Sequence, residues 1–271
     1  QRKTSIDHPT ILESVPTDEH FDIAFSVMQG QQQKELLETF KKLDTNILVL
    51  VGNNLEAEFC QNSILEKRPD LHLLFGFQNS AGHREGAKAI AARLPVTKLF
   101  VGGLHNAASE TDLVAIQKAF NPKDVKITPV DNMYAYYLCH VAEVMPYGYM
   151  CYKVDGNLKK LQRRDIKTIM QATKECFAYL KSTGIEVMPK GEDKFYNGGI
   201  KTYAMFLLYR FISKTILGQL MVADHCKNGI KEMIYIHKKF EEWRLQHKNI
   251  PMPTWDKISQ YMPTDIDDIH C

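Results

Sequence analysis

Phe21-Asp-Ile-Ala-Phe-Ser-Val-Met28 is the first of two stretches that decide the fold of this chain, and it runs into Gln29-Gly30-Gln31. The second is Ile47-Leu-Val-Leu-Val51, which runs into Gly52-Asn53-Asn54. Short runs that are apolar on both faces are typical of buried strands in a parallel sheet. Ligands of such sheets bind beyond the carboxyl ends of the strands. The small and carboxamide residues that follow both runs are therefore candidates for binding a small molecule.

The alternation of strand and helix patterns continues to about residue 130. We expect strands at 22–28, 47–52, 71–77, 97–102 and 124–129, with helices such as Gln31–Leu43 and Thr111–Phe120 between them. The opening segments Lys3–Ile6 and Thr10–Glu13 could supply short edge strands. Strands that alternate with helices predict a parallel α/β sheet with right-handed crossovers.

After Asp131 the strand pattern ends, and the remaining periodic stretches predict helices. We expect them at 132–150 (with a kink at Pro146), 158–182, 199–222 and 224–247, followed from residue 251 by a short helix or tail. The layout predicts a Rossmann-like α/β domain over residues 1–130 and a helical C-terminal domain over residues 131–271. A substrate cleft is expected between the two domains.

Charge and composition argue against several classes of partner. The 34 Lys and Arg residues nearly balance the 32 Asp and Glu residues, and the net charge of +2 gives no electrostatic case for nucleic acid. We expect no membrane partner either. The basic pairs Lys159-Lys160 and Arg163-Arg164 are expected on a solvated helix face.

The most hydrophobic helix candidate runs from Tyr203 to Val222. Arg210, Lys214 and Gln219 interrupt it, so it falls short of a charge-free membrane span. We therefore expect a helix at the centre of a soluble bundle.

Six scattered cysteines and the absence of a CxxC pair favour reduced thiols in a cytoplasmic protein. Cys139 precedes His140, but neighbouring helix residues point in different directions, so we expect Cys139 to serve packing. No apolar segment follows Gln1–Ser5, so no signal peptide is visible.

Two polar segments after strands are candidate ligand sites. The side chains of Asn53 and Asn54 offer hydrogen-bond donors and acceptors to a ligand. The alternative is a simple turn in which one of them caps a helix, because asparagine favours both places. Gln78–Gly86 could line the same crevice with His83 or Arg84 facing an anion, or could be a surface loop.

Two further titratable residues lie on helices. His140 lies among aromatic and aliphatic residues, where a hydrogen-bonded core histidine is more common than a catalytic one. Glu232 lies at the edge of an apolar stripe, where a solvated carboxylate is the ordinary alternative. The spacing of His, Asp, Glu and Cys residues predicts no metal site.

Segments throughout the chain resemble the ketopantoate reductase family (2-dehydropantoate 2-reductases and their relatives). They are Phe21–Gln31, Asn46–Glu58, Leu74–Gly86, Val101-Gly102 and the helical half, including Glu232-Met-Ile-Tyr-Ile236. The resemblance implies an N-terminal Rossmann domain, a helical C-terminal domain, and NADPH-dependent reduction of a 2-keto acid or related carbonyl compound.

The resemblance also implies roles for individual residues. Asn53 matches an asparagine that contacts cofactor and substrate, and Glu232 matches an acidic residue that binds substrate. The resulting candidates for binding NADP are Gln29, Gly30, Gln31, Gly52, Asn53 and Asn54. The candidates for binding substrate are Asn53, His83, Arg84 and Glu232.

The sequence departs from the family in two ways. It has no GxGxxG turn, so we expect that an N-terminal segment of the family fold is not part of it. The first-domain lysine of the family falls at Met28, and the general-acid lysine falls at Tyr137 or Leu138. The asparagines of that helix fall at Val141 and Met145.

Reduction of a carbonyl needs a proton donor. Tyr134, Tyr136, Tyr137 or His140 could supply the proton by position, and Tyr137, His140 and Glu232 are the catalytic candidates. A second hypothesis is a non-catalytic protein that binds a nucleotide or metabolite on a dehydrogenase scaffold. A third is that the apolar helices serve mainly to form a homodimer.

Overall fold

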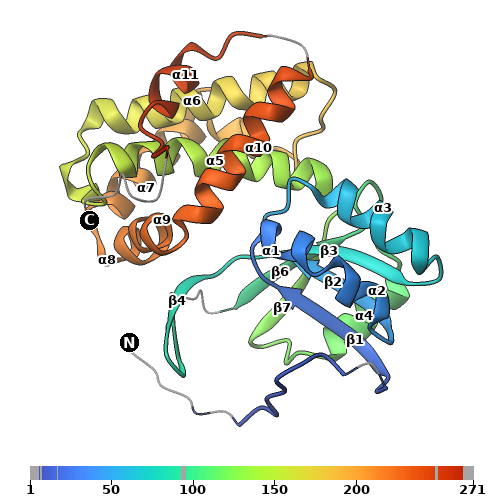
Figure 1. Cartoon of the computed structure of the whole chain (residues 1–271). Helices are drawn as coiled ribbons and strands as arrows, with labels where there is room; N and C mark the ends of the chain where they lie inside the picture. Colours follow the sequence, from blue (N-terminus) through green and yellow to red (C-terminus); the bar gives the residue numbers. More distant parts are fainter. Residues whose placement is uncertain (1–5, 7, 17, 93–95, 248–249, 265–271) are drawn as a thin grey trace.

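The computed structural model describes residues 6, 8–16, 18–92, 96–247 and 250–264, but not the side chains of Ala81, His83, Arg84 and Ala92. A sheet with its helices forms the N-terminal half, and helices alone form the C-terminal half (Figure 1). This confirms the expected fold class. The change from sheet to helices falls between β7 and α5, and the division into two domains at residue 130 remains our proposal.

Five strands form the main sheet in the order β1-β2-β3-β6-β7. They are β1 (Phe21–Val27), β2 (Thr45–Val51), β3 (His72–Gln78), β6 (Thr97–Gly102) and β7 (Val125–Pro129). All five lie within one or two residues of the expected strands. Leu48, Val49 and Leu50 of β2 are almost fully buried, as expected for a strand covered on both faces.

The sheet is mixed rather than wholly parallel. β1, β2 and β3 are parallel, but β6 pairs with β3 antiparallel, and β7 then runs parallel to β6. The physical reason lies between β3 and β6, where the chain forms a hairpin of β4 (Ala81–Glu85) and β5 (Lys88–Ala92). Without a crossover helix, β6 returns along β3 in the opposite direction. Thr10–Glu13 form no strand, and Lys3–Ser5 lie outside the described residues.

Four helices belong to the sheet half, and one predicted helix is split in two. They are α1 (Gly30–Glu35), α2 (Leu37–Lys42), α3 (Ala57–Lys67) and α4 (Glu110–Lys118). The predicted helix Gln31–Leu43 corresponds to α1 and α2, which separate at Leu36.

The helical half contains more breaks than expected. Its elements are α5 (Met133–Lys153), η1 (Leu158–Lys160), α6 (Arg163–Ser182), η2 (Glu192–Phe195), α7 (Gly199–Lys214), α8 (Ile216–Gly218), η3 (Gln219–Ala223), α9 (Asp224–Asn228), α10 (Ile230–Leu245) and α11 (Pro253–Ser259). Asn132 caps α5 by accepting from the amide of Ala135 at 2.8 Å, and α5 continues through Pro146.

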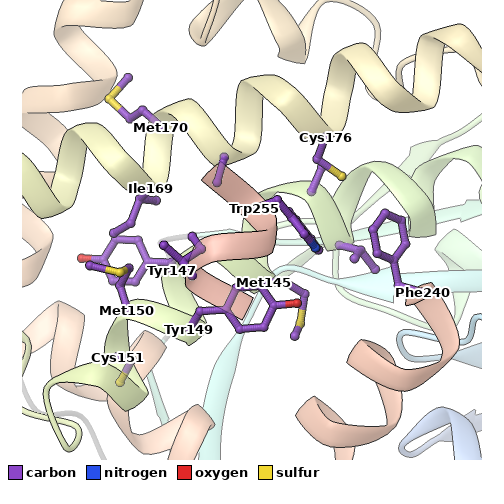
Figure 2. Packing of buried hydrophobic residues seen from close by; sticks show 14 of the residues in the cluster. Met145, Tyr147, Tyr149, Met150, Cys151, Ile169, Met170, Cys176, Phe240 and Trp255 are labelled. Carbon is purple, nitrogen blue, oxygen red and sulfur yellow. The ribbon is translucent and has the colours of Figure 1, made fainter. Parts of the chain in front are cut away.

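The core of the helical half lies between α5, α6, α10 and α11. Figure 2 shows Trp255 of α11 beside Phe240 of α10, and their ring centroids are 5.2 Å apart.

Five cysteines are free and buried, including Cys139, and Cys271 lies outside the described residues. The exposed pairs Lys159-Lys160 and Arg163-Arg164 lie in and beside η1 as expected.

The most hydrophobic helix does not lie at the centre of the bundle. α7 buries Phe206 and Ser213, but its other side leaves Ile200, Tyr203 and Phe211 exposed. Across the described part of the chain, no single helix is long and apolar enough to cross a membrane. Gly199–Lys214 and Ile216–Asn228 pass that test only as a pair, with a bend of 83° between them.

Candidate functional site

The carboxyl ends of β1 and β2 meet at a turn that requires glycine. Gly52 has a φ of +150°, and a Cβ placed on it would lie 2.3 Å from the carbonyl oxygen of Met28. The amide of Met28 donates to the carbonyl of Val51 at 3.3 Å. The loop after β1 and the loop after β2 are therefore in direct contact, as the two sequence segments predicted.

Unpaired polar atoms gather at this edge of the sheet. Four buried side-chain nitrogen or oxygen atoms have no hydrogen-bond partner among the described residues, and three belong to Ser26, Gln31 and Asn53. Asn53 is only 5% exposed, and its unpaired atom is the amide oxygen Oδ1. Because an unpaired buried polar atom is costly, such atoms at one edge indicate a place where a ligand supplies the missing donors.

The neighbouring Asn54 has a structural role instead. Its Oδ1 accepts from the amide of Glu56 at 2.9 Å, and its Nδ2 donates to Oε1 of Gln33 at 2.9 Å. With its side chain 1% exposed and bonded on both sides, Asn54 holds the loop in place. Its proposed contact with the cofactor stays a prediction.

Gly30 brings the two halves of the molecule together. A Cβ at this position would lie 2.8 Å from the carbonyl oxygen of Asn53 and 3.2 Å from Cε1 of Tyr235. The first turn of α1, the loop after β2 and α10 therefore meet at one point. Gln29 precedes this turn, and its Oε1 accepts from Nε2 of Gln31 at 2.6 Å.

Glu56, which the sequence reasoning missed, joins the loop after β2 to α10. Its Oε2 accepts from the hydroxyl of Tyr235 at 2.9 Å, and its Oε1 lies 2.9 Å from Nζ of Lys34 and 3.5 Å from Nζ of Lys239. Burial raises the pKa of Glu56, but the hydrogen bonds from Lys34 and Tyr235 and the charge of Lys239 outweigh it and hold this pKa below its ordinary value. No local sequence signal links Glu56 to Tyr235, because they are 179 residues apart.

Glu232 lies on the side of α10 that faces this junction. It precedes Tyr235 by three residues and Lys239 by seven, and residues at these spacings share one face of a helix. Met233, Ile236 and Phe240 point instead into the helical core. Burial raises the pKa of Glu232 to about 7, and its carboxyl makes no hydrogen bond or ion pair with any described residue. Asn53 thus lies in the loop that meets α10, and Glu232 lies on the face of α10 that bears Tyr235.

Tyr137 and Val141 of α5 face the interior. The hydroxyl of Tyr137 donates to the carbonyl of Gly76 at 3.1 Å, and burial raises the pKa of Tyr137. Tyr137, Val141 and Met145 are at most 1% exposed. Leu138, the alternative position of the family lysine, is also 1% exposed. The helix positions at which the sequence resemblance placed a lysine and two asparagines are therefore packed.

His140 lies in an aromatic cluster between α5 and β3. Its ring centroid is 4.2 Å from that of Phe77 and 6.3 Å from that of Tyr136. Burial, with a smaller effect from His225, lowers the pKa of His140 to about 4. The ring is therefore neutral at physiological pH.

The candidates His83 and Arg84 lie in β4, and their side chains are outside the described part of the structure. Gln78–Gly86 forms the end of β3 and the first strand of a hairpin rather than a loop. The hairpin contacts α9 of the helical half, so it forms a second connection between the two halves (Figure 1).

An open hollow of about 1000 Å³ lies at the opposite edge of the sheet. It is lined by the first residues of β1 and β2, from Phe21 to Ile23 and at Asn46-Ile47, and by α4. None of the candidate site residues lines it. Among the described residues, no group of three or more His, Cys, Asp or Glu side chains is placed to hold a metal ion.

No family model matches the sequence, and no curated protein matches it either. Solved structures do match its fold. D-mandelate dehydrogenase in a ternary structure with NADH and anilino(oxo)acetate is 12% identical, with a TM-score of 0.59 over 92% of this chain and 77% of that chain. Apo yersinopine dehydrogenase is 11% identical, with a TM-score of 0.61 over 90% of this chain and 70% of that chain.

The 2-dehydropantoate 2-reductase from Methylococcus capsulatus is 14% identical, with a TM-score of 0.56 over 90% of this chain and 74% of that chain. The fold expected from the sequence resemblance, a Rossmann-like sheet followed by helices, is therefore confirmed as that of the ketopantoate reductases and related dehydrogenases.

Proposed function

We propose that this protein is an NAD(P)-dependent oxidoreductase of the ketopantoate reductase type that reduces a 2-keto acid or a related carbonyl compound. The observation that carries the proposal is the buried, unpaired Oδ1 of Asn53 at the junction of β2 and α10, on the side of α10 that bears Glu232. Enzymes of this fold include one whose structure holds NADH and a 2-oxo acid derivative, anilino(oxo)acetate, together.

The residues at the strand ends fit the nicotinamide end of such a cofactor. Gly30 and Gly52 let backbone approach closely, and the unpaired oxygens of Gln31 and Asn53 can accept from an amide or a ribose hydroxyl. Gln29 would help to hold Gln31 in position. The cofactor, when bound, supplies a hydride. The sequence resemblance predicts NADP as the cofactor. NAD is the alternative, because the structure of D-mandelate dehydrogenase contains NADH.

Glu232 is the best-placed proton donor in this proposal. With a pKa of about 7 it is protonated in a large share of molecules at neutral pH, and a protonated carboxyl can donate to a carbonyl oxygen that gains negative charge. The geometry favours Glu232 over the other two catalytic candidates, because the hydroxyl of Tyr137 is bonded to Gly76 and His140 is neutral. His83 and Arg84 remain proposed contacts for a substrate carboxylate.

One observation favours the second hypothesis, a protein that binds a nucleotide or metabolite without turnover. Tyr137 or Leu138 stands where the resemblance has a lysine, and Val141 and Met145 stand where it has asparagines. All of these positions are packed in the interior. Such a protein would still bind its ligand at the Asn53 junction but would not catalyse the reduction. A homodimer through the helical half and a cytoplasmic location also stay predictions.

Titration of the full chain with NADPH and with NADH, followed by nucleotide fluorescence, tests binding, and a panel of 2-keto acids tests turnover. Saturable binding with turnover supports the oxidoreductase, and saturable binding without turnover supports the second hypothesis. Asn53→Ala should weaken binding on the order of tenfold or more, since one buried polar contact is worth about 1–3 kcal/mol. The exposed Asn62→Ala is the matched control, and equal effects of both substitutions would contradict the proposal.

A further inference from the structure

Large apolar side chains are exposed together on one surface of the helical half. Ile200 is 89% exposed and Phe211 59% exposed on α7, and Ile216, just beyond it, is 69% exposed. We call this surface the α7 face. Its members are Ile200, Tyr203, Leu207, Leu208 and Phe211 of α7. Ile216, Leu217 and Met221 are also exposed, but they follow a bend of 83° after α7 and are not counted in this surface.

The exposed residues of α7 form a single stripe. At about 100° per residue, Ile200, Tyr203, Leu207, Leu208 and Phe211 fall within a sector of roughly 140° around the helix. Phe206 and Ser213 are buried on the opposite side, where α7 packs on the helical core. The helix is therefore anchored along its length, with its apolar stripe turned outward.

The charges around this stripe have one sign. Residues 194–223 contain Lys194, Lys201, Arg210 and Lys214 but no Asp or Glu. At the same helical spacing, Lys201 and Arg210 lie at opposite borders of the stripe. The small net charge of the whole chain thus conceals a local positive excess.

A second group of basic residues lies next to the end of α7. Nζ of Lys214 donates to the carbonyls of Lys159 and Leu161, so η1 and the start of α6 lie beside it. This brings four exposed basic side chains near the stripe, those of Lys159, Lys160, Arg163 and Arg164. Within the described residues, none of these four side chains forms an ion pair, and neither Lys201 nor Arg210 does.

Against the sequence expectation of no membrane partner, we propose that the α7 face binds the surface of an anionic membrane, with α7 in the plane of the interface. An outward apolar stripe with basic borders is the pattern of helices that insert shallowly among acidic headgroups. A second copy of this chain is the other obvious occupant. Two-fold pairing of the α7 face would, however, bring its basic borders toward one another, because residues 194–223 contain no Asp or Glu to offset them.

Co-sedimentation of the full chain with vesicles tests the proposal. We expect binding to vesicles made of equal parts of phosphatidylcholine and phosphatidylserine, and weak binding to phosphatidylcholine alone. The double substitution Ile200→Glu/Phe211→Glu should reduce partitioning about tenfold or more, because it removes apolar contact and adds like charge.

The matched control is Leu245→Glu/Val114→Glu, whose side chains are 88% and 49% exposed elsewhere on the molecule. It makes the same change in charge and should bind as wild type does. Lys201→Gln/Arg210→Gln should reduce binding about thirtyfold, at about 1 kcal/mol for each of the two basic residues, and added salt should weaken binding as well.

Three results would overturn the proposal. The first is absence of binding to the phosphatidylserine vesicles. The second is equal loss of binding in the α7 variant and its control. The third is a wild-type dimer in sedimentation velocity that Ile200→Glu/Phe211→Glu converts to monomer without any lipid dependence, which would assign the α7 face to a second copy. Catalysis does not enter any of these readouts.

Discussion

The hydroxyl of Tyr235 donates to Oε2 of Glu56 at 2.9 Å, and this contact joins α10 of the helical half to the loop that follows β2. Asn53 lies three residues before Glu56 on that loop, and Glu232 lies three residues before Tyr235 on α10. The bond therefore sets the separation of the two residues on which the proposed function depends.

Removing this bond should loosen the two halves. Tyr235→Phe is expected to lower the free energy of unfolding by about 1 kcal/mol, as is usual for one part-buried hydrogen bond. A double-mutant cycle with Glu56→Gln in urea should show coupling of about 1 kcal/mol. The exposed Tyr203→Phe should change nothing, and zero coupling would show that the contact does not connect the halves energetically.

Gly30→Ala should disturb the same junction by steric overlap. The added Cβ would approach the carbonyl oxygen of Asn53 to 2.8 Å, so the loop must move, at a cost of about 2 kcal/mol. Gly156→Ala is the control, because its added Cβ would have no neighbour within 4 Å. Its only cost is the backbone strain of an alanine at a φ of +73°. Thermal unfolding gives the stability of both variants, and only Gly30→Ala should also weaken nucleotide binding. Normal binding by Gly30→Ala would place the ligand elsewhere.

Glu232 should make stability depend on pH. Burial holds its folded pKa at about 7, above that of an exposed carboxyl, so between the two values the folded protein keeps a proton that the unfolded chain has released. The free energy of unfolding therefore falls as the pH rises through this window and levels off above it. Glu232→Gln should be more stable than wild type at alkaline pH, by on the order of 2 kcal/mol, and nearly equal to it in acid.

Urea unfolding of Glu232→Gln across this pH range provides the check. The exposed Glu66→Gln should follow the wild-type curve. A pH profile of Glu232→Gln that is identical to that of the wild type would mean that Glu232 is solvated and is no proton donor.

Tyr137→Phe separates a packing role from a catalytic one. Its hydroxyl bonds to the carbonyl of Gly76, which also accepts from the amide of Gly52 at 3.0 Å, so the loss leaves no unpaired carbonyl. We expect a loss of about 1 kcal/mol in the free energy of unfolding and unchanged kcat for any 2-keto acid that is turned over. A hundredfold fall in kcat would show instead that the hydroxyl of Tyr137 takes part in catalysis.

The strands could be predicted from the sequence because the runs at 47–51 and 72–77 are apolar on both faces, and only a covered sheet accepts such runs. The direction of β6 could not, because it depends on the hairpin at 81–92. The hairpin residues whose side chains the structure describes are largely exposed, and its sequence lacks the alternating pattern of a half-buried strand.

Asn53 became a candidate through its place after a strand and through the family resemblance, which also suggested Glu232 and a cleft between the two domains. The contact between Glu56 and Tyr235 could not be predicted, because it joins distant segments and no local pattern encodes it. The exposure of α7 was missed for a similar reason. Composition shows that a helix is apolar but not which side the rest of the chain covers.

A crystal structure of the full chain with NADPH and a 2-keto acid would show whether Asn53 and Glu232 belong to one ligand site. We expect the nicotinamide amide within hydrogen-bond distance of Oδ1 of Asn53, and the keto oxygen within reach of the carboxyl of Glu232. A nucleotide bound at another edge of the sheet, or a ligand that touches only one of these two side chains, would contradict it.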